Sequence, residues 1–593
     1  MGTEIKNSEE IMKKFLSLIL ALALISGMLL VFASCGKAKD QGAEISVYLG
    51  EVYDLDPTDY YVDSNAEQVM SLLFEPLFSV KKNGKLTCNA AAKKYKVDKR
   101  ERTITVELRE SYWSDSTLVK AEDFLYAWRD ILLEPNNANP AASLLYDIEN
   151  AYEIKNGDLS IYELGVAVTE TLELTITYRE GANYMQLLKN LASVATAPVR
   201  QDVITEINSG YWSKMVNTAY TNGPFMISSI DYESDNFTLV RNSGYHQSLD
   251  VKDDTKIVRP SKLMSSFTLG SEETRLSYTS IENNTVFYMT DMPLADRAGN
   301  QKSAVVVDDL STYTYVFNVE NPLFAIKEVR QALSMAIDRD AIISAITFGT
   351  AANGFLPNTV LNTANGKAFS RDSLISTSAK LDEAKALLAG VDFSGIEKSF
   401  KLTVNDDEES KKIAELVSAV WTELGFTVTV DALAPIANTV GKDDDAANIK
   451  DSAIQVLVNK AARGERSFDV IAVDWQMYST DPFVALSAFA TEFSGCGSLL
   501  PEDTTVYGSF GGYKNEEYDK LIAEAYAETD AKLRAEKLLA AEQMLVDSAC
   551  IVPLVFNQSV TFVSKDISKL AYDGFGNFLL TDLKLKNYEK YLD

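Results

Sequence analysis

Histidine and cysteine are scarce in this chain, which has one histidine and four cysteines among 593 residues. The single histidine, His246, has no second histidine with which to form a metal site or a catalytic triad, so we interpret it as structural. Cys88, Cys496 and Cys550 are too far apart to indicate a disulfide framework or a zinc site. The fold must therefore depend on its hydrophobic core, and apolar residues make up 46% of the sequence.

The sequence also lacks the common catalytic and phosphate-binding motifs. It contains no G-x-S-x-G, no H-E-x-x-H and no G-x-x-x-x-G-K-[ST]. The acidic run at residues 443–445 lacks the spacing of a calcium loop, and we interpret it as a solvated loop. We therefore predict a protein that is not an enzyme and that holds no metal and no cofactor.

Positive charge is in short supply, since 56 lysines and arginines stand against 85 aspartates and glutamates and the net charge is −29. A surface this acidic repels nucleic acid and anionic lipid, so we expect no nucleic-acid partner. No period of 20 to 50 residues repeats along the chain, which argues against a solenoid or a propeller. A chain of 593 residues is longer than one hydrophobic core organises, so two or three subdomains are expected.

The N-terminal region has the pattern of an export signal. Two lysines precede an almost unbroken apolar run at residues 15–32, and small residues then lead to Cys35. This order resembles the bacterial lipobox, in which the cysteine is lipidated and becomes the first mature residue, although Phe32 stands where the lipobox prefers leucine. The resemblance implies a lipoprotein signal peptide at residues 12–34, a lipid on Cys35 and a tether at residues 35–44.

A plain membrane anchor helix is the alternative for the same region, since about 18 apolar residues can span a bilayer. Both alternatives put residues 36–593 outside the cytoplasm. With lipid on Cys35, we expect the protein at the outer face of the bacterial cytoplasmic membrane.

Strand and helix patterns alternate along the chain, which predicts an α/β fold. Residues 400–405 alternate as a strand, a helix follows that Gly425 ends, and residues 426–430 alternate again, so we predict a βαβ unit with parallel strands. Residues 104–108 form a further predicted strand, and a helix follows it. Apolar residues at helical spacing predict three helices. The helix between the two strands has Ile413, Leu416, Val417, Val420, Trp421 and Leu424. A long helix has Val329, Ala332, Leu333, Ala336 and Ile337, and the helix after residues 104–108 has Phe124, Leu125, Trp128, Ile131 and Leu132.

Six segments form an ordered set of motifs: LDPTDYYVDSNAEQVMSLLFEPL (55–77), YWSDSTLVKAEDFLYAWRD (112–130), NGPF (222–225), YTYVFNVENPLFAIKEVRQALSMAIDRD (313–340), LDEAKALLAG (381–390) and GYKNEEYDKLIAEA (512–525). In this order and at this spacing, the set resembles the oligopeptide, dipeptide and nickel class of solute-binding proteins that serve ABC importers. Each motif alone is weak, but the order and spacing of the six fit the family over nearly the whole mature chain.

This resemblance implies an α/β, two-lobed periplasmic-binding-protein-like fold of class II, with three domains and two hinge crossings. Residues 437–453 and 489–510 depart from the family pattern and look like loop insertions. The implied divisions are domain I at residues 45–83, 204–310 and 556–593, domain II at residues 84–203, and domain III at residues 311–555.

The resemblance also implies capture rather than catalysis. The chain would be the lipid-anchored binding component of an ABC importer, closing its lobes on an extended peptide that it holds by main-chain hydrogen bonds. We expect a monomer whose partners are a peptide or other small solute, the permease and ATPase subunits, and the membrane through the lipid on Cys35. Two alternatives stay open: the same fold and transporter with an oligosaccharide or modified amino acid as solute, and a surface receptor without transport.

The family's ligand contacts, carried over by position, put the strand SVYLGEVY and the segment VDWQMY on opposite sides of the ligand. For the aromatic positions, ordinary core packing is the alternative. The ligand-binding residues that the resemblance implies are Tyr48, Leu49, Tyr126, Asp474, Trp475, Gln476, Tyr478 and Tyr513.

Tyr478 stands where peptide-binding members of this class commonly carry an aspartate that pairs with the peptide ammonium. A phenol brings no opposite charge near neutral pH. Asp474 or Asp481 could take that role, although Asp481 followed by Pro482 is also typical of a helix start. We therefore predict either peptide binding without a strict demand for a free amino terminus or binding of a non-peptide solute.

Overall fold

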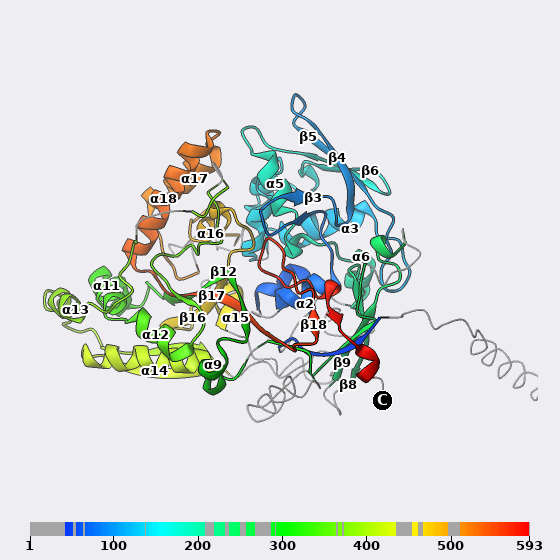
Figure 1. The fold of residues 1–593 in the computed structure, drawn as a ribbon. Helices are drawn as coiled ribbons and strands as arrows, with labels where there is room; N and C mark the ends of the chain where they lie inside the picture. Colours follow the sequence, from blue (N-terminus) through cyan, green and yellow to red (C-terminus); the bar gives the residue numbers. More distant parts are fainter. Residues whose placement is uncertain are drawn as a thin grey trace, which may run out of the picture. The chain divides into compact units, whose positions relative to one another are not determined.

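A mixed sheet of eleven strands runs through the described chain and carries the polar residues of interest (Figure 1). Contacts between Cα atoms group Ala43–Asp593 as one compact unit. Cys35, the acidic run at 443–445 and most of the two predicted insertions lie outside the described residues. The computed structural model describes residues 42–50, 55–62, 66–136, 138–207, 219–231, 236–249, 257–266, 286–290, 292–362, 366–369, 373–433, 453–460, 466–495 and 510–591.

Two long antiparallel strands, β12 and β17, form the middle of this sheet. Their register shifts between Asp308 and Thr312 of β12, which marks an irregularity partway along the pair. On the other side of β12, β16 is antiparallel to it. In sheet order the strands are β15 (Thr427–Leu433), β14 (Ser399–Asn405), β16 (Val470–Gln476), β12 (Ala304–Phe317), β17 (Ile551–Val563), β11 (Tyr288–Met289), β1 (Glu44–Tyr48), β10 (Lys262–Ser266), β9 (Asn236–Arg241) and β8 (Phe225–Asp231), and β13 (Thr350–Ala351) also pairs with β17.

The predicted βαβ unit is confirmed. Strands β14 and β15 are parallel, and α14 (Glu408–Glu423) connects them. The side chain of Asp407 caps the start of α14, and Gly425 follows its end with a φ of 91°, a conformation that glycine adopts without steric cost. On the buried face of α14, the Trp421 indole donates a hydrogen bond to the Leu333 carbonyl at 2.9 Å.

The helix predicted through Val329 and Ile337 is present but shorter than predicted, because this region holds two short helices. They are α11 (Lys327–Met335) and α12 (Arg339–Ile346). Asp338 separates them: its backbone is extended and its side chain accepts a hydrogen bond from the Ala341 amide at 2.9 Å. An N-cap residue cannot also continue the preceding helix, and the apolar spacing alone does not reveal this break.

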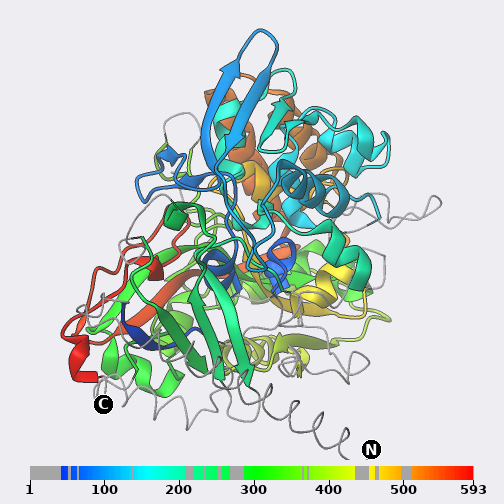
Figure 2. The same cartoon turned by 90° about the vertical axis from the view of Figure 1, so that its right-hand side faces the viewer.

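A second sheet has the order β4–β5–β7–β6, and its β4–β5 hairpin is prominent in Figure 2. Strand β5 confirms the prediction at residues 104–108, and the helix predicted after it is α3 followed by a π-helical turn, η2. The strands of the smaller sheets are β4 (Ala92–Asp98), β5 (Thr103–Leu108), β6 (Val166–Glu170) and β7 (Glu173–Thr177), with the pairs β2 (Ser79–Val80) and β3 (Leu86–Thr87), and β18 (Ile567–Ser568) and β19 (Lys584–Leu585).

Helices connect these strands, and α17 and α18 pack against each other. The remaining α-helices are α2 (Ala66–Leu73), α3 (Ala121–Tyr126), α4 (Ala151–Lys155), α5 (Tyr184–Asn190), α6 (Gln201–Ile207), α7 (His246–Leu249), α9 (Leu294–Asn300), α10 (Pro322–Ala325), α13 (Leu381–Leu388), α15 (Ala453–Gln455), α16 (Pro482–Ser487), α17 (Glu516–Ala527) and α18 (Ala531–Ser548). The 3₁₀ and π segments are η1 (Pro57–Val62), η2 (Ala127–Leu132), η3 (Pro140–Leu145), η4 (Ile161–Glu163), η5 (Val194–Thr196), η9 (Val456–Lys460), η12 (Leu580–Asp582) and η13 (Tyr588–Tyr591).

The scarce histidine and cysteines have structural surroundings. His246 is buried at the start of α7, with its Nε2 2.6 Å from a Glu75 carboxylate oxygen. Cys88 and Cys550 form no disulfide, and Cys496 lies outside the described residues. Within the described ranges, no helix has both the length and the apolar character needed to cross a membrane.

Candidate functional site

The C-terminal end of β16 presents different side chains to its two faces. Trp475 is buried, and its ring centroid lies 4.9 Å from that of Phe489 and 5.5 Å from that of Phe510. Asp474 and Gln476 point to the opposite face, because side chains alternate along a strand. The indole therefore has core neighbours on its own face, and the polar face of β16 belongs to Asp474 and Gln476.

The side chain of Gln476, on β16, contacts the buried carboxyl group of Glu67, on α2. The Gln476 amide donates a hydrogen bond to one Glu67 oxygen, and the Asn577 amide donates to the other at 2.9 Å. Burial raises the pKa of Glu67 to about 8, and the negative charges of Asp309 and Asp573 add to the shift. Within the described part of the chain, no lysine or arginine forms an ion pair with Glu67, so only neutral donors stabilise its charge.

Asp474 has a similar environment on the same face of the sheet. Its Oδ1 accepts a hydrogen bond from the Asn557 amide at 2.7 Å. Burial raises the pKa of Asp474 to about 7, with further contributions from the carboxylates of Asp407, Glu409 and Asp309. Two carboxyl groups that titrate near neutral pH thus lie on adjoining elements, β16 and α2.

Tyr478 follows β16 in a left-handed backbone conformation, with a φ of 56°. Its side chain is buried, and burial raises the pKa of its phenol, as do the nearby negative charges of Asp59 and Glu67. Tyr478 therefore lies close to α2 and to η1. Its hydroxyl remains protonated at neutral pH, so it brings no opposite charge to an ammonium group.

Asp481 serves the helix start that its sequence context favours. It is the N-cap of α16, with Pro482 at the first helical position, and its Oδ1 accepts a hydrogen bond from the Phe483 amide at 3.2 Å. Both of its oxygens also accept hydrogen bonds from the Arg534 guanidinium, each at 2.9 Å. Because this pair is buried and bidentate, Asp481 is not left to bind a ligand ammonium.

The other predicted site residues are also buried, but they lie on different elements of the fold. Tyr48 ends β1 and packs with Met289 and Phe562, and Leu49 follows it in the core. Tyr126 ends α3, where burial raises the pKa of its phenol and the charge of Asp56, just before η1, contributes. η1 is therefore near both Tyr126 and Tyr478.

Tyr513 belongs to a different neighbourhood. Its ring packs edge-on against Tyr518 at 5.7 Å, and burial raises the pKa of its phenol. The nearby Gly511 carbonyl accepts a hydrogen bond from the Val319 amide, just beyond the end of β12 that lies opposite the start of β16. Tyr513 is thus placed towards the far end of β16 from Gln476, and its ligand role stays a prediction.

Sequence reasoning missed Glu67, Asn577 and Asn557. Glu67 lies within the recognisable motif at 55–77, and an acidic side chain in the first turn of an apolar helix is normally explained by the helix dipole. The two asparagines carry no sequence signal, because their partners are far away in the chain. No sequence signal distinguishes Glu67 from an ordinary acidic residue at a helix start, because its burial depends on packing.

The chemistry of this site suits recognition. Buried carboxyl, amide and phenol groups can form hydrogen bonds with a polar solute in a medium of low dielectric constant. No group of three or more histidine, cysteine, aspartate or glutamate side chains in the described ranges could hold a metal ion.

Comparisons with known proteins agree with this interpretation. The dipeptide-binding protein DppE of Bacillus subtilis is 26% identical over 485 residues, which cover 81% of this chain and 80% of that protein. Two solved structures have the same fold: OppA of Listeria monocytogenes bound to peptide, with a TM-score of 0.73 and 22% identity over 92% of this chain and 99% of that one, and OppA of Haemophilus influenzae in complex with RPPGFSPFR, with a TM-score of 0.71 and 22% identity over 92% and 99%. The predicted class II binding-protein fold is thereby confirmed.

The family model for the bacterial extracellular solute-binding proteins, family 5, matches residues 88–495. Members of this family bind solutes and are not enzymes, which agrees with the lack of catalytic motifs in the sequence. This chain belongs to family 5 of the bacterial extracellular solute-binding proteins.

Proposed function

We propose that this protein is the lipid-anchored, extracytoplasmic binding component of an ABC importer, and that it captures oligopeptides and delivers them to a permease and its ATPase. The family match over residues 88–495 is the observation that carries this proposal. The named relatives support peptides as the ligand class, because DppE is a dipeptide-binding protein and both OppA structures contain peptides.

Capture would proceed by rotation of domain III, residues 311–555, against the rest of the mature chain. The long pair β12 and β17 would supply the two hinge crossings, near residues 310 and 556. Support comes from the register shift between Asp308 and Thr312, because an irregular ladder bends more easily than a regular one.

The ligand would not need a free amino terminus. Tyr478 provides no negative charge, and Arg534 already neutralises Asp481. Main-chain hydrogen bonds and the side chains of Tyr478 and Gln476 would then hold the ligand. The same surroundings also suit a non-peptide solute that stacks and accepts hydrogen bonds, which is the second candidate.

Calorimetry with the peptide RPPGFSPFR in free and N-acetylated forms tests this ligand class. Acetylation removes the positive charge of the peptide amino terminus. We expect the two forms to bind with affinities within about tenfold of each other, since no carboxylate of the protein pairs with that charge. A loss of a hundredfold or more would show that an acidic anchor operates, and Tyr478 would be misinterpreted. Native mass spectrometry of the isolated protein is the complementary measurement, and retention of an oligosaccharide in place of peptides would favour the second candidate.

The lipid anchor would be on Cys35, which lies outside the described residues. Two or more acyl chains give stable membrane attachment where one is marginal. Replacing Cys35 with alanine should abolish lipid labelling and release the protein from the membrane, whereas Cys88→Ala is the control that should change neither. Unchanged labelling of the Cys35 variant would contradict the anchor.

A further inference from the structure

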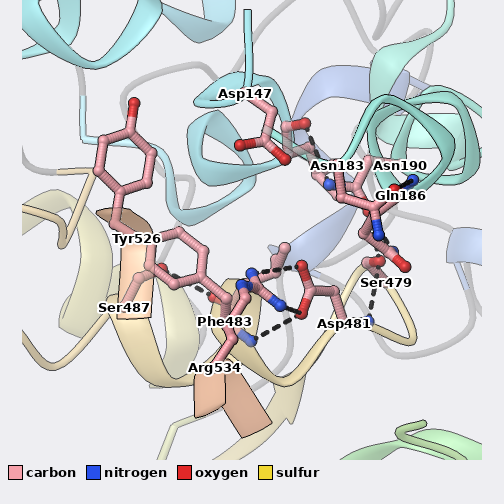
Figure 3. Close-up of polar contacts among 12 residues, drawn as sticks. Asp147, Asn183, Gln186, Asn190, Ser479, Asp481, Phe483, Ser487, Tyr526 and Arg534 are labelled. Atoms are coloured by element: carbon pink, nitrogen blue, oxygen red, sulfur yellow. Dashed lines mark hydrogen bonds and ion pairs between the residues drawn. The ribbon is translucent and has the colours of Figure 1, made fainter. Parts of the chain in front are cut away.

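Two buried polar contacts fix the loop at residues 477–481, which joins β16 to α16. Figure 3 shows the Arg534 guanidinium facing Asp481, and the Ser479 side chain pointing towards Asn190. The Ser479 hydroxyl donates to the Asn190 Oδ1 at 2.7 Å. Tyr478 precedes these two anchored residues, so the contacts of Ser479 and Asp481 restrict its backbone.

The Arg534 contact is local to the proposed domain III. Asp481 caps α16 and Arg534 lies on α18, where its guanidinium is 5.5 Å from the centroid of the Phe483 ring. All three residues belong to the segment 311–555. The two hydrogen bonds of this anchor thus lie within one segment, although the charge of Asp147, from residues 84–203, also acts on Arg534.

The Ser479 contact, in contrast, joins the proposed domains II and III. Asn190 ends α5, and its Oδ1 also accepts a hydrogen bond from Gln186 at 3.0 Å while its Nδ2 donates to the Leu144 carbonyl at 3.3 Å. The exposed fractions of Ser479 and Asn190 are only 1% and 3%. Separation of the two segments would break the bond between them, and water would have to replace it.

The Ser479 hydroxyl connects the contact with Asn190 to the backbone conformation of residues 477–481. The Ser479 Oγ accepts a hydrogen bond from the Asp481 amide at 3.1 Å while it donates to Asn190. Next to it, Tyr478 has a φ of 56°, and a residue other than glycine keeps such a conformation only where its neighbours hold it. Contact with Asn190 and the conformation of Tyr478 are therefore coupled.

We infer that the Ser479–Asn190 hydrogen bond is a latch that forms when residues 84–203 and 311–555 close on a ligand, and that it positions Tyr478 for binding. This inference rests on the proposed function, because a captured solute stabilises the closed state, which the ligand-free chain reaches only transiently. Ser479 and Asn190 are positioning residues that do not touch the ligand. The latch therefore strengthens the binding of every ligand by the same factor, through the closed population.

The test is Ser479→Ala, with Ser487→Ala as a matched control. Ser487 is equally buried, but its hydroxyl donates to the Val484 carbonyl within its own helix, at 3.2 Å. Calorimetry would use RPPGFSPFR, trialanine and trilysine. We expect Ser479→Ala to raise the Kd of each peptide that binds by a common factor of about ten, while the control stays near the native value. The melting temperatures of the two ligand-free variants should be equal.

A double-mutant cycle with Asn190→Ala should show that the second substitution adds little once the first is present. Factors that differ more than about threefold between peptides would mean direct ligand contact, and an unchanged Kd with a lower melting temperature would mean a permanent structural bond. Either result overturns the latch.

If the native chain binds none of the peptides, peptide capture fails as the proposed function, and the latch is judged on cross-linking alone. The pair Ser479→Cys and Asn190→Cys should then form a disulfide under mild oxidation, and the control pair Ser487→Cys and Asn190→Cys should not. Failure of the first pair to cross-link would overturn the latch.

Discussion

Asp481 and Glu67 are two buried carboxylates near Tyr478, and they differ in what stabilises their charge. Each carboxylate oxygen of Asp481 accepts a hydrogen bond from one guanidinium, that of Arg534. Glu67 receives its hydrogen bonds from the neutral amides of Gln476 and Asn577, and its charged neighbours are acidic. Burial is similar in the two places, with exposed fractions of 2% and 9%, so the partners make the difference.

The comparison distinguishes a carboxylate whose charge is fixed by its arginine partner from a carboxyl group whose charge changes with pH. A carboxylate paired with arginine keeps its partner over the whole physiological pH range, because the guanidinium does not lose its proton. A carboxyl group held only by amides changes its charge with pH, and it can also respond to a donor or cation that a ligand brings. Substitutions at each place can test this distinction.

The largest effect is expected from Arg534→Met, which would leave Asp481 buried without its partner. We expect a loss of about 3 to 5 kcal/mol in the free energy of unfolding, measured by urea titration at pH 7. Lys532→Met on the same helix is the control. Its side chain is exposed and its amine lies 3.8 Å from Glu536, so its loss should stay within about 0.5 kcal/mol. A loss below about 1 kcal/mol for Arg534→Met would remove the contrast between the two sites.

A smaller effect is expected from Glu67→Gln, and it should depend on pH. The pKa of Glu67 is raised to about 8, so the folded state retains a proton that the unfolded state releases above about pH 4.5. This group therefore makes the native protein less stable as the pH rises from about 4.5 to about 8. The variant should be more stable than the native protein at pH 8, on the order of 2 kcal/mol, with little difference at pH 4.5.

Urea titrations at both pH values measure this effect. Glu122→Gln, at an exposed position in the first turn of α3, is the matched control and should keep the native pH dependence. The prediction fails if Glu67→Gln destabilises the protein equally at pH 4.5 and pH 8, because Glu67 would then act only as a hydrogen-bond acceptor.

The smallest effect is expected from Asp474→Asn, which keeps an oxygen for the Asn557 amide. The pKa of Asp474 is raised to about 7, so its unfavourable contribution develops between about pH 4 and pH 7, a narrower window than for Glu67. We expect the variant to gain about 1 kcal/mol at pH 7.5 and almost nothing at pH 4. An equal gain at both pH values would contradict the titration of Asp474.

Local patterns in the sequence predicted several elements correctly. Alternation at residues 400–405 and apolar spacing up to Trp421 predicted β14 and α14, because each signal lies within one continuous segment. Asp481 and Pro482 likewise predicted the start of α16. The helix predicted through Ile337 ends earlier than expected, at Met335, and Asp338 caps the next helix although the apolar spacing looks continuous.

The candidate site was predicted less completely than the fold. Gln476, Asp474 and Tyr478 were expected there, and Gln476 does contact Glu67, which no sequence pattern distinguished. Tyr513 was expected beside the same ligand; its ring packs against Tyr518, and its ligand role stays a prediction. Positions carried over from a family identify the segment, whereas the neighbours of each side chain depend on packing.

The sequence by itself determined the α/β class and the family motifs, because these are properties of neighbouring residues. Only the tertiary structure decided which buried groups meet. The Gln476–Glu67 bond joins residues 409 positions apart, the Asn577–Glu67 bond 510 and the Ser479–Asn190 bond 289. Such pairs form because folding removes water from these groups, and each must then find a partner among whatever side chains packing has brought within reach.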